Sequence, residues 1–454
     1  KNNVFQFDFL NDDFSKLPDP LQSIINNPEK RKKLVIYINP PYAEAGNTKQ
    51  RTGTGENKAN TAISNKTYEK YKGKIGKASN ELFTQFLIRI YSEIEGCKIA
   101  NFSKLKNLQS SNFKDFRNVF LARLEKLFVV PADTFDNVKG KFPIGFFVWN
   151  SIEKEVFQEI DADVYNKNGE FVTSKGFYGN LPESINKWIK SFDDSKTESI
   201  GLIVSTAPDF QHDNQLCILS KQQERYCFNI TSLNLIKTSI YFSVRQCIVP
   251  SWLNDRDQYL FPNDGWKTDT EFQNDCLAFT LFQGQNRITS SEGTNHWIPF
   301  TEYEVNAQAK FESNFMTNFI KGKIKQEVTT TDLFSTSCQP ELVSGSNEML
   351  KQVQHDTNIG VRNDKPLVFS EEATAVFDAG RELWKYYHAQ NGVNVNASLY
   401  DIREYFQGRN DKGRMNSKSD DATYTKLIAE LRSKLAILAD KIKPKVYEYG
   451  FLKE

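Results

Sequence analysis

The chain has 454 residues, enough for about three domains. Apolar residues make up 39% and charged residues 25%, a composition that excludes a globally disordered chain. Because 58 Lys and Arg are balanced by 57 Asp and Glu, a polyanionic partner has to meet a local basic patch rather than a uniformly basic protein.

The number and spacing of the cysteines and histidines indicate the cellular compartment and whether a zinc site is expected. The six cysteines show no Cys-x-x-Cys spacing, so we expect reduced, buried thiols in a cytosolic protein. Four histidines and no paired cysteines argue against a zinc site. The chain holds no run of 18 apolar residues and no apolar signal region, which argues against a membrane span.

Residues 1–160 alternate between short apolar runs and amphipathic helical stretches. This alternation predicts an α/β domain with a largely parallel sheet that ends near residue 160. Apolar runs predict strands at 4–10, 33–38, 98–102, 127–130 and 142–149. Helical spacing predicts helices at 79–95, capped by Ser79, and at 113–127.

The rest of the chain changes character twice. Residues 161–325 predict a mixed α+β domain, in which Asn168-Gly169 marks a hairpin and further strands lie at 199–204, 216–219 and 239–244. Residues 326–366 have the composition of a linker or insertion, and residues 367–454 form a helical region. Its expected helices are 370–388, 398–406 and 421–443, the last ending at Pro444, with an irregular basic segment at 407–419.

The tetrapeptide Asn39-Pro40-Pro41-Tyr42 follows an apolar strand directly. Open α/β sheets bind ligands at the carboxyl ends of their strands. Two prolines stiffen the turn and remove two N–H donors, which leaves carbonyls that face outward. These carbonyls and the Asn39 side chain can accept both hydrogens of a planar amino group. Tyr42 can then stack on the ring that bears this amino group. The alternative is a rigid turn with a packed tyrosine.

These residues resemble those of the N6-adenine DNA methyltransferases of restriction–modification systems, over roughly residues 4–150. The resemblance implies an incomplete Rossmann-like core that uses S-adenosylmethionine, with Asn39, Pro40, Pro41 and Tyr42 as the catalytic loop. It also implies that Asp8 and Phe9 bind the cofactor. Phe135, with Phe142 as second choice, would stack on a flipped adenine of duplex DNA.

The implied chemistry is direct in-line methyl transfer to adenine N6. Residues 161–325 would then recognise the DNA target, and the protein would belong in the bacterial cytoplasm with the nucleoid. Two alternatives stay open. One is a glutamine or ribosomal RNA methyltransferase, which shares the tetrapeptide. The other is a non-catalytic DNA-binding subunit with an incomplete methyltransferase core.

The sequence departs from this family at the glycine-rich loop that should hold the methionine part of the cofactor. Neither Thr52-Gly-Thr-Gly55 nor Phe377-Asp-Ala-Gly380 follows a predicted strand. We therefore expect an N-terminally shortened enzyme or one half of a split one. Its partner would be the missing half or an endonuclease.

Two basic segments are candidates for DNA contact. Residues 49–77 carry eight Lys or Arg against two Glu, and residues 409–418 carry four against one Asp. Phosphate contacts from such segments make DNA binding depend on salt. The alternative is a solvated charged loop. The side chains we expect to meet the DNA backbone are Lys49, Arg51, Lys72, Lys74, Lys77, Arg409 and Arg414.

Overall fold

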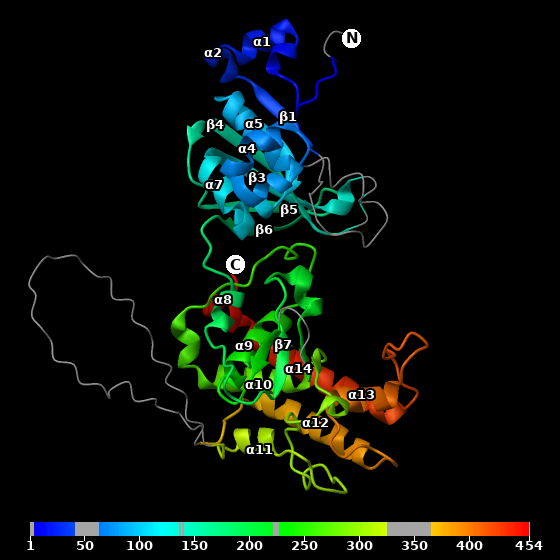
Figure 1. Ribbon diagram of the computed structural model, residues 1–454. Helices are drawn as coiled ribbons and strands as arrows, with labels where there is room; N and C mark the ends of the chain where they lie inside the picture. Colours follow the sequence, from blue (N-terminus) through cyan, green and yellow to red (C-terminus); the bar gives the residue numbers. More distant parts are fainter. Residues whose placement is uncertain are drawn as a thin grey trace, which may run out of the picture.

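The computed structural model describes residues 4–40, 63–135, 138, 140–220, 227–324 and 365–453. Two units lie end to end, with residues 4–178 in one and residues 184–453 in the other (Figure 1). Among the described residues, no helix combines the length and the apolar character needed to cross a membrane. The five described cysteines are free thiols, four of them buried, as the sequence predicts.

A six-stranded sheet forms the centre of the first unit. Its strands are β1 (Val35–Ile38), β2 (Lys98–Lys104), β3 (Ala122–Pro131), β4 (Pro143–Lys154), β5 (Glu159–Tyr165) and β6 (Phe171–Tyr178). Their order is β1-β2-β4-β3-β5-β6. Strand β1 is parallel to β2 and β3 is parallel to β5, whereas β4 and β6 run the other way. The sheet is therefore mixed, not largely parallel, and it extends past residue 160 to Tyr178.

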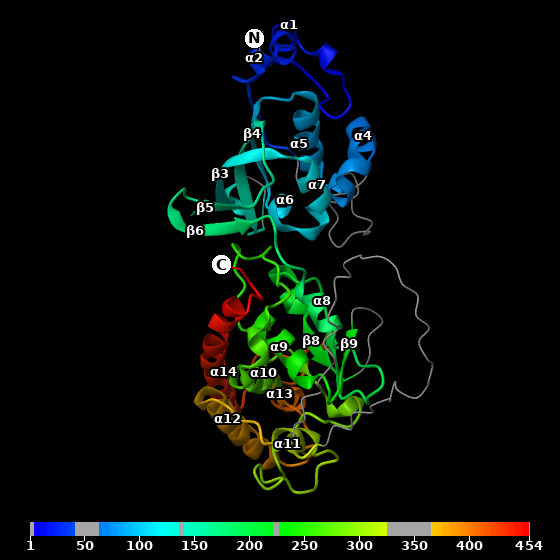
Figure 2. The same ribbon diagram turned by 90° about the vertical axis from the view of Figure 1, so that its left-hand side faces the viewer.

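The helices of the first unit cover one face of this sheet, except for the first two, which lie at the outer end of the unit (Figure 2). They are α1 (Asp19–Ile25), α2 (Pro28–Arg31), α4 (Lys66–Ile75), α5 (Leu82–Glu93), α6 (Lys106–Gln109) and α7 (Lys114–Val119). The core between helices and sheet contains Leu87, Ile99, Phe147 and Trp149, all nearly inaccessible. Alternation along the strands sends Phe102, Phe128 and Phe146 to the opposite face.

Three local predictions for the first unit are wrong. Residues 4–10 form no strand, because Asp8 accepts the backbone N–H groups of Leu10 and Asn11 and closes a turn. Helix α5 begins at Leu82 after Glu81, and Ser79 donates to the Gly76 carbonyl instead of capping the helix. The helix expected at 113–127 stops at Val119, because β-strand pairing with β4 claims the chain from Ala122 onward.

A second, smaller sheet and a set of helices form the other unit. The sheet order is β10-β8-β7-β9, from β7 (Gly201–Val204), β8 (Cys217–Leu219), β9 (Cys227–Ile230) and β10 (Asn286–Arg287). The helices are α8 (Ile185–Lys190), α9 (Leu235–Gln246), α10 (Thr270–Phe282), α11 (Phe315–Ile320), α12 (Glu371–His388), α13 (Leu399–Gln407) and α14 (Ala422–Glu448). One hydrophobic core joins α9 and α10 to α12 and α14, so the C-terminal helices share the core of residues 185–320.

The hairpin at Asn168-Gly169, the strands at 199–204 and 216–219, and the helices capped by Ser370 and Ser398 are confirmed. The strand expected at 239–244 is instead part of α9, whose residues Thr238 to Arg245 are all buried. A helix that is buried on every side lacks the one-sided periodicity that distinguishes it from a buried strand. Helix α14 also continues through Pro444 to Glu448, beyond its expected end.

Candidate functional site

The directions of the strands bring the chemically interesting segments to one edge of the first sheet. Strands β1, β2 and β3 run the same way, because β4 is antiparallel to both of its neighbours and β1 is parallel to β2. Their carboxyl ends therefore share an edge, where β4 begins. Asn39 follows β1, Phe135 lies four residues after β3, and Phe142 immediately precedes β4. Carboxyl edges of such sheets are where ligands bind.

The structure describes Asn39 and Pro40, whereas Pro41 and Tyr42 lie outside the described residues. Ile38, the last residue of β1, pairs with Asn101 of β2. Asn39 is exposed, and the ring of Pro40 is buried. The corner thus leaves the sheet with its asparagine facing outward and its proline anchored.

Aromatic rings lie beside this corner on the face that the helices do not cover. The Phe102 ring lies 4.8 Å from Phe146 and 5.1 Å from Phe135, the latter in an edge-to-face arrangement. The Phe146 ring is 6.3 Å from that of Tyr37, whose residue is 62% exposed. Phe135 is half-buried and therefore keeps surface that another ring could cover.

Phe142 lies at the same edge, directly before β4. Its ring packs on the small cluster of Val130, Ala132 and Ile144. A Cβ atom at Gly140 would lie only 3.1 Å from this ring, so the glycine allows the ring to close over the turn. Phe135 packs on the same cluster, so both candidate rings are held by the same apolar residues.

Asp8 and Phe9 lie near the same edge but not in the expected strand. Leu10 packs on Leu82, the first residue of α5, which places the turn beside the start of that helix. Asp8 is exposed, and its carboxylate accepts hydrogen bonds from the turn, including one of 2.9 Å from the Asn11 side chain. The Phe9 ring stacks on Phe86 at 5.1 Å.

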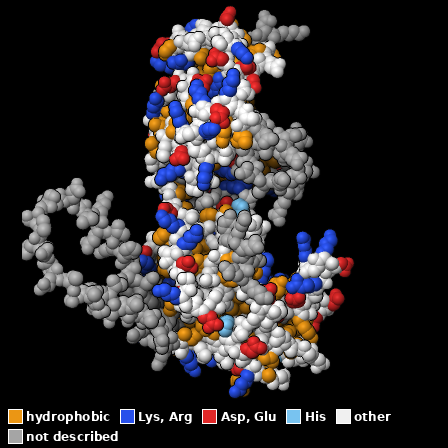
Figure 3. All heavy atoms as spheres, viewed as in Figure 1, with side chains coloured by type: hydrophobic (Ala, Val, Ile, Leu, Met, Phe, Trp, Pro, Cys, Tyr) orange, Lys and Arg blue, Asp and Glu red, His pale blue; other side chains and the backbone are white. Residues whose placement is uncertain are grey.

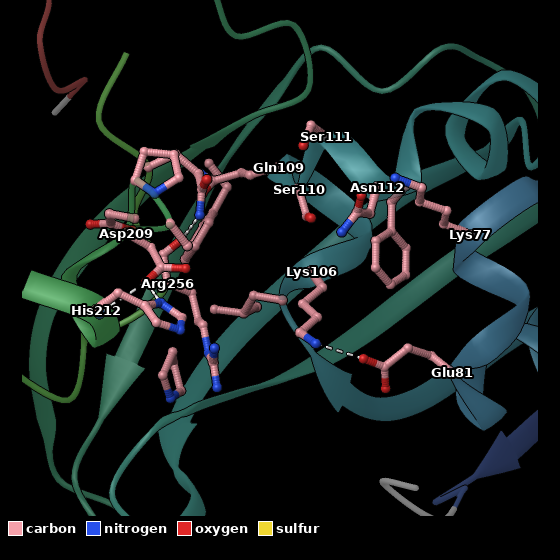
Figure 4. A pocket seen from close by; sticks show the side chains of 18 of the residues that line it. Lys77, Glu81, Lys106, Gln109, Ser110, Ser111, Asn112, Asp209, His212 and Arg256 are labelled. Carbon is pink, nitrogen blue, oxygen red and sulfur yellow. Dashed lines mark hydrogen bonds and ion pairs between the residues drawn. The ribbon is translucent and has the colours of Figure 1, made fainter. Parts of the chain in front are cut away.

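A cavity of about 460 Å³ lies between the two units and opens beside this edge (Figure 4). Leu105 after β2 and Pro143 at the start of β4 belong to its wall. The first unit also contributes Lys77, Glu81, Lys106, Ser110, Ser111 and Asn112, and the second contributes Asp209, His212, Arg256, Asp257 and Gln258.

Most charges around the cavity are paired. Lys106 lies 2.7 Å from Glu81, and His212 Nδ1 lies 2.5 Å from Asp209. Burial raises the pKa of Asp257, although its ion pair with Lys175 opposes this shift. Lys77 also lines the cavity and is exposed. The lining therefore offers hydrogen-bonding groups of both signs rather than a uniformly basic wall.

The structure separates the expected DNA-backbone residues into two groups, while Lys49 and Arg51 lie outside the described residues. Lys72, Lys74 and Lys77 belong to the first unit, where Lys72 is paired with Glu69 at 2.7 Å and Lys74 lies over the Tyr71 ring. Arg409 and Arg414 lie in the second unit, between α13 and α14.

Sequence reasoning missed the residues of the second unit that line the cavity. Asp209 and His212 come from one loop and Arg256 from another, more than forty residues later. No spacing in the sequence links them, because only tertiary packing brings the two loops together. The Asp209-x-x-His212 spacing alone is too common on surfaces to have singled out the pair.

Comparisons with known proteins add little. No protein-family model matches the sequence, and no curated protein matches it. One similar solved structure is the ATP-dependent Type ISP restriction-modification enzyme LlaBIII bound to DNA, with 12% identity and a TM-score of 0.22. The match covers 48% of this chain and 17% of that one, and a TM-score this low carries no argument about fold or function.

Proposed function

We propose that this protein is an adenine-specific DNA methyltransferase that transfers a methyl group from S-adenosylmethionine to adenine N6 in duplex DNA. The observation that carries the proposal is the Asn39–Pro40 corner, which leaves β1 at the carboxyl edge with an exposed asparagine. Half-buried Phe135 lies at the same edge. A methyltransferase core of Rossmann-like type is the corresponding fold.

The chemistry assigned to the corner follows from its donors and acceptors. Pro40 has no N–H, so the turn presents carbonyl oxygens together with the Asn39 amide oxygen. These acceptors would bind both hydrogens of the exocyclic amine and leave its lone pair aimed at the methyl group. The nitrogen–carbon bond would form as the methyl–sulfur bond breaks, S-adenosylhomocysteine would leave as the neutral thioether, and the proton lost from the nitrogen would pass to solvent. S-adenosylmethionine supplies the activated methyl group.

The cofactor would be held in part by residues near the start of α5. The exposed Asp8 carboxylate can accept the adenine amino group, and Phe9 offers an adjacent ring. These groups fit the adenosine end of S-adenosylmethionine. Within the described ranges we find no glycine-rich loop after a strand that fits its methionine end. A non-catalytic DNA-binding role is for that reason the second candidate.

The two-unit arrangement supports a DNA substrate. The cavity between the units adjoins the catalytic edge and is lined with hydrogen-bonding side chains such as Asn112 and Gln258. We expect an adenine rotated out of the duplex to enter at this edge, to which Leu105 and Pro143 of the cavity wall belong. Such extrusion is required because a stacked base hides its amino group.

The test measures N6-methyladenine by mass spectrometry after incubation of duplex DNA and S-adenosylmethionine with the purified full-length protein, in which the expected N-terminal part is restored. We expect methylated adenine with the wild type and a loss of at least about a hundredfold for Asn39→Ala, the typical effect of removing one polar group that stabilises a transition state. Asn168→Ala, in the exposed β5–β6 turn, is the matched control and should keep full activity. Unchanged methylation by Asn39→Ala contradicts the mechanism.

The same experiment separates the alternatives. Methylglutamine in a protein substrate or methylated ribosomal RNA, without methylated DNA, would replace the DNA assignment. Duplex binding without any methylated product and without heat released on titration with S-adenosylmethionine would favour the non-catalytic role.

A further inference from the structure

A rigid hairpin projects from the second unit between α13 and α14. We call residues 407–416 the projecting hairpin, and Figure 1 shows it to the right of the second unit. Backbone hydrogen bonds join Asn410 N to Arg414 O at 2.9 Å and Asn416 N to Gly408 O at 3.0 Å. Gly413, with φ of +70°, closes the turn.

Side chains reinforce this hairpin from within. The Asn410 Oδ1 atom accepts the backbone N–H groups of Lys412 and Arg414, each at 3.0 Å. Arg409 donates to Glu404 at 2.5 Å and to the Gly413 carbonyl at 2.7 Å. Arg409, which we expected at the DNA backbone, is thus largely occupied as an internal brace.

The basic side chains of the hairpin other than Arg409 lie at its tip. Lys412 and Arg414 are exposed, and neither side chain forms an ion pair or hydrogen bond with the part of the chain that the structure describes. Lys418 beyond the hairpin is likewise exposed, and Asp411 is the acidic residue of the tip. Figure 3 shows Lys and Arg side chains gathered on this projection.

Packing in the hydrophobic core does not explain why the projecting hairpin has an ordered conformation. Gln407 at its base is buried and bonds to Tyr424, whereas residues 408–416 are exposed or half-buried and none of them belongs to the hydrophobic core of the second unit. Fixing an exposed loop costs about 1–2 kcal/mol per residue in backbone entropy. A loop stiffened by its own hydrogen bonds can bind a partner without meeting that cost again on binding.

We propose that the projecting hairpin is a second DNA contact, in which Lys412 and Arg414 bind backbone phosphates along a groove of the duplex. A two-stranded ribbon fits the major groove, and Arg and Lys are the usual phosphate ligands. In Figure 1 the hairpin and the carboxyl end of β1 both face the right-hand side of the molecule. One duplex could therefore meet both units. This inference rests on the proposed function for its DNA partner.

The test compares Lys412→Gln/Arg414→Gln with a control that removes the same two charges elsewhere. Lys190→Gln/Lys196→Gln is that control, since both lysines are exposed and belong to the end of α8 and the loop after it, and Figure 1 shows α8 on the opposite side of the second unit from the hairpin. The readout is the fluorescence anisotropy of a labelled duplex titrated with the full chain at several salt concentrations.

We expect the hairpin variant to lower the slope of log affinity against log salt by about 1.8, since each lost phosphate contact removes about 0.9. The ratio of the wild-type binding constant to that of the variant should then fall about twelvefold between 50 and 200 mM salt. The control should keep the wild-type slope. Identical slopes for the hairpin variant and the wild type overturn the inference.

Two further outcomes are decisive. If labelled polyglutamate binds the wild type as tightly as the duplex does, and loses binding in the hairpin variant, the partner of the hairpin is an acidic polypeptide and the DNA assignment is wrong. A wild type that methylates DNA but does not use the hairpin refutes this inference alone. A wild type that neither binds nor methylates duplex DNA refutes the proposed function.

Discussion

Lys175 of β6 forms an ion pair of 2.5 Å with Asp257 of the second unit. The same ammonium group donates to the Leu253 carbonyl at 3.1 Å, and Leu253 and Trp252 pack on the core of the first unit. The loop that contains Trp252 and Asp257 therefore fastens the second unit to the sheet. Both side chains of the pair are largely buried, with exposed fractions of 16% and 23%.

Lys175→Met should destabilise the protein by about 1–3 kcal/mol, because a charged hydrogen-bond partner is lost and Asp257 stays buried. Urea denaturation measures this cost. Lys187→Met is the control, since its pair with Glu183 is exposed and should be worth less than about 1 kcal/mol. Equal costs for the two variants would show that Lys175 does not fasten the units. The exchanged pair Lys175→Asp with Asp257→Lys should recover part of the loss.

Phe135→Ala should weaken capture of the flipped base. Stacking is worth about 1–3 kcal/mol per base, which corresponds to roughly a ten- to hundredfold loss in methyl transfer. The fluorescence of 2-aminopurine at the target position should rise less with this variant than with wild type. Phe142→Ala serves as the comparison, and a larger effect there would reverse our assignment of the stacking ring.

Gly380→Ala should be destabilising although alanine is the better helix former. A Cβ atom at this position of α12 would lie within 2.3 Å of the Phe282 ring. Overpacking of this kind costs about 1–3 kcal/mol. Gly73→Ala is the matched control in α4, where the added atom meets nothing within 4 Å, and it should stabilise by about 0.5–1 kcal/mol. Thermal unfolding of both variants tests whether Gly380→Ala lowers the stability and Gly73→Ala raises it.

Ser370→Ala should cost about 1 kcal/mol, because the hydroxyl caps α12 by accepting the Ala373 N–H at 3.1 Å. Ser417→Ala removes an exposed hydroxyl for which the structure records no hydrogen bond among the described residues. Chemical denaturation should leave the Ser417 variant within about 0.5 kcal/mol of wild type. A Ser370 variant as stable as the Ser417 variant contradicts the capping role.

Asp213 should make stability depend on pH in an unusual direction. Burial raises its pKa to about 6, against the opposing pull of Arg245 and Tyr259. The folded state then binds a proton more tightly than the unfolded state, whose aspartate has a pKa of 3.8. The stabilising contribution is complete below about pH 4 and is lost as the pH rises through about 6, by about 3 kcal/mol in total.

Comparison with Asp213→Asn isolates this effect. The difference in unfolding free energy between wild type and variant should shrink as the pH rises from about 4 to about 6. A difference that grows over this range would mean that the Arg245 pair outweighs burial and that the pKa of Asp213 is lowered.

The sequence predicted elements wherever a local signal was complete. Ser370 and Ser398 each precede an amphipathic run, and both helices begin where their capping side chains place them. Asn168-Gly169 marks its hairpin because the left-handed φ of Gly169 favours glycine. The run 33–38 is a strand because its apolar residues are bounded by charges on one side and by a proline on the other.

Errors arose where the decisive partner lies far along the chain. Residues 4–10 have the composition of a strand but find no neighbour with which to pair, so Asp8 closes a turn instead. Residues 239–244 contain apolar residues of strand type, yet packing against α10 on one side and the small sheet on the other buries them as a helix. The antiparallel direction of β4 could not be predicted either, because a short apolar run does not indicate whether its strand pairs in parallel or antiparallel fashion.

The sequence by itself determined the Asn39–Pro40 corner, the aromatic and basic segments, and the starts of α12, α13 and α14, because each depends on residues close together in the chain. Tertiary structure alone decided that Asn39, Phe135 and Phe142 share one edge and that Asp209, His212 and Arg256 face Lys106 across a cavity. It also turned Arg409 into a brace and left Arg414 exposed. The physical reason is that strand pairing and burial join residues over separations at which composition and periodicity carry no information.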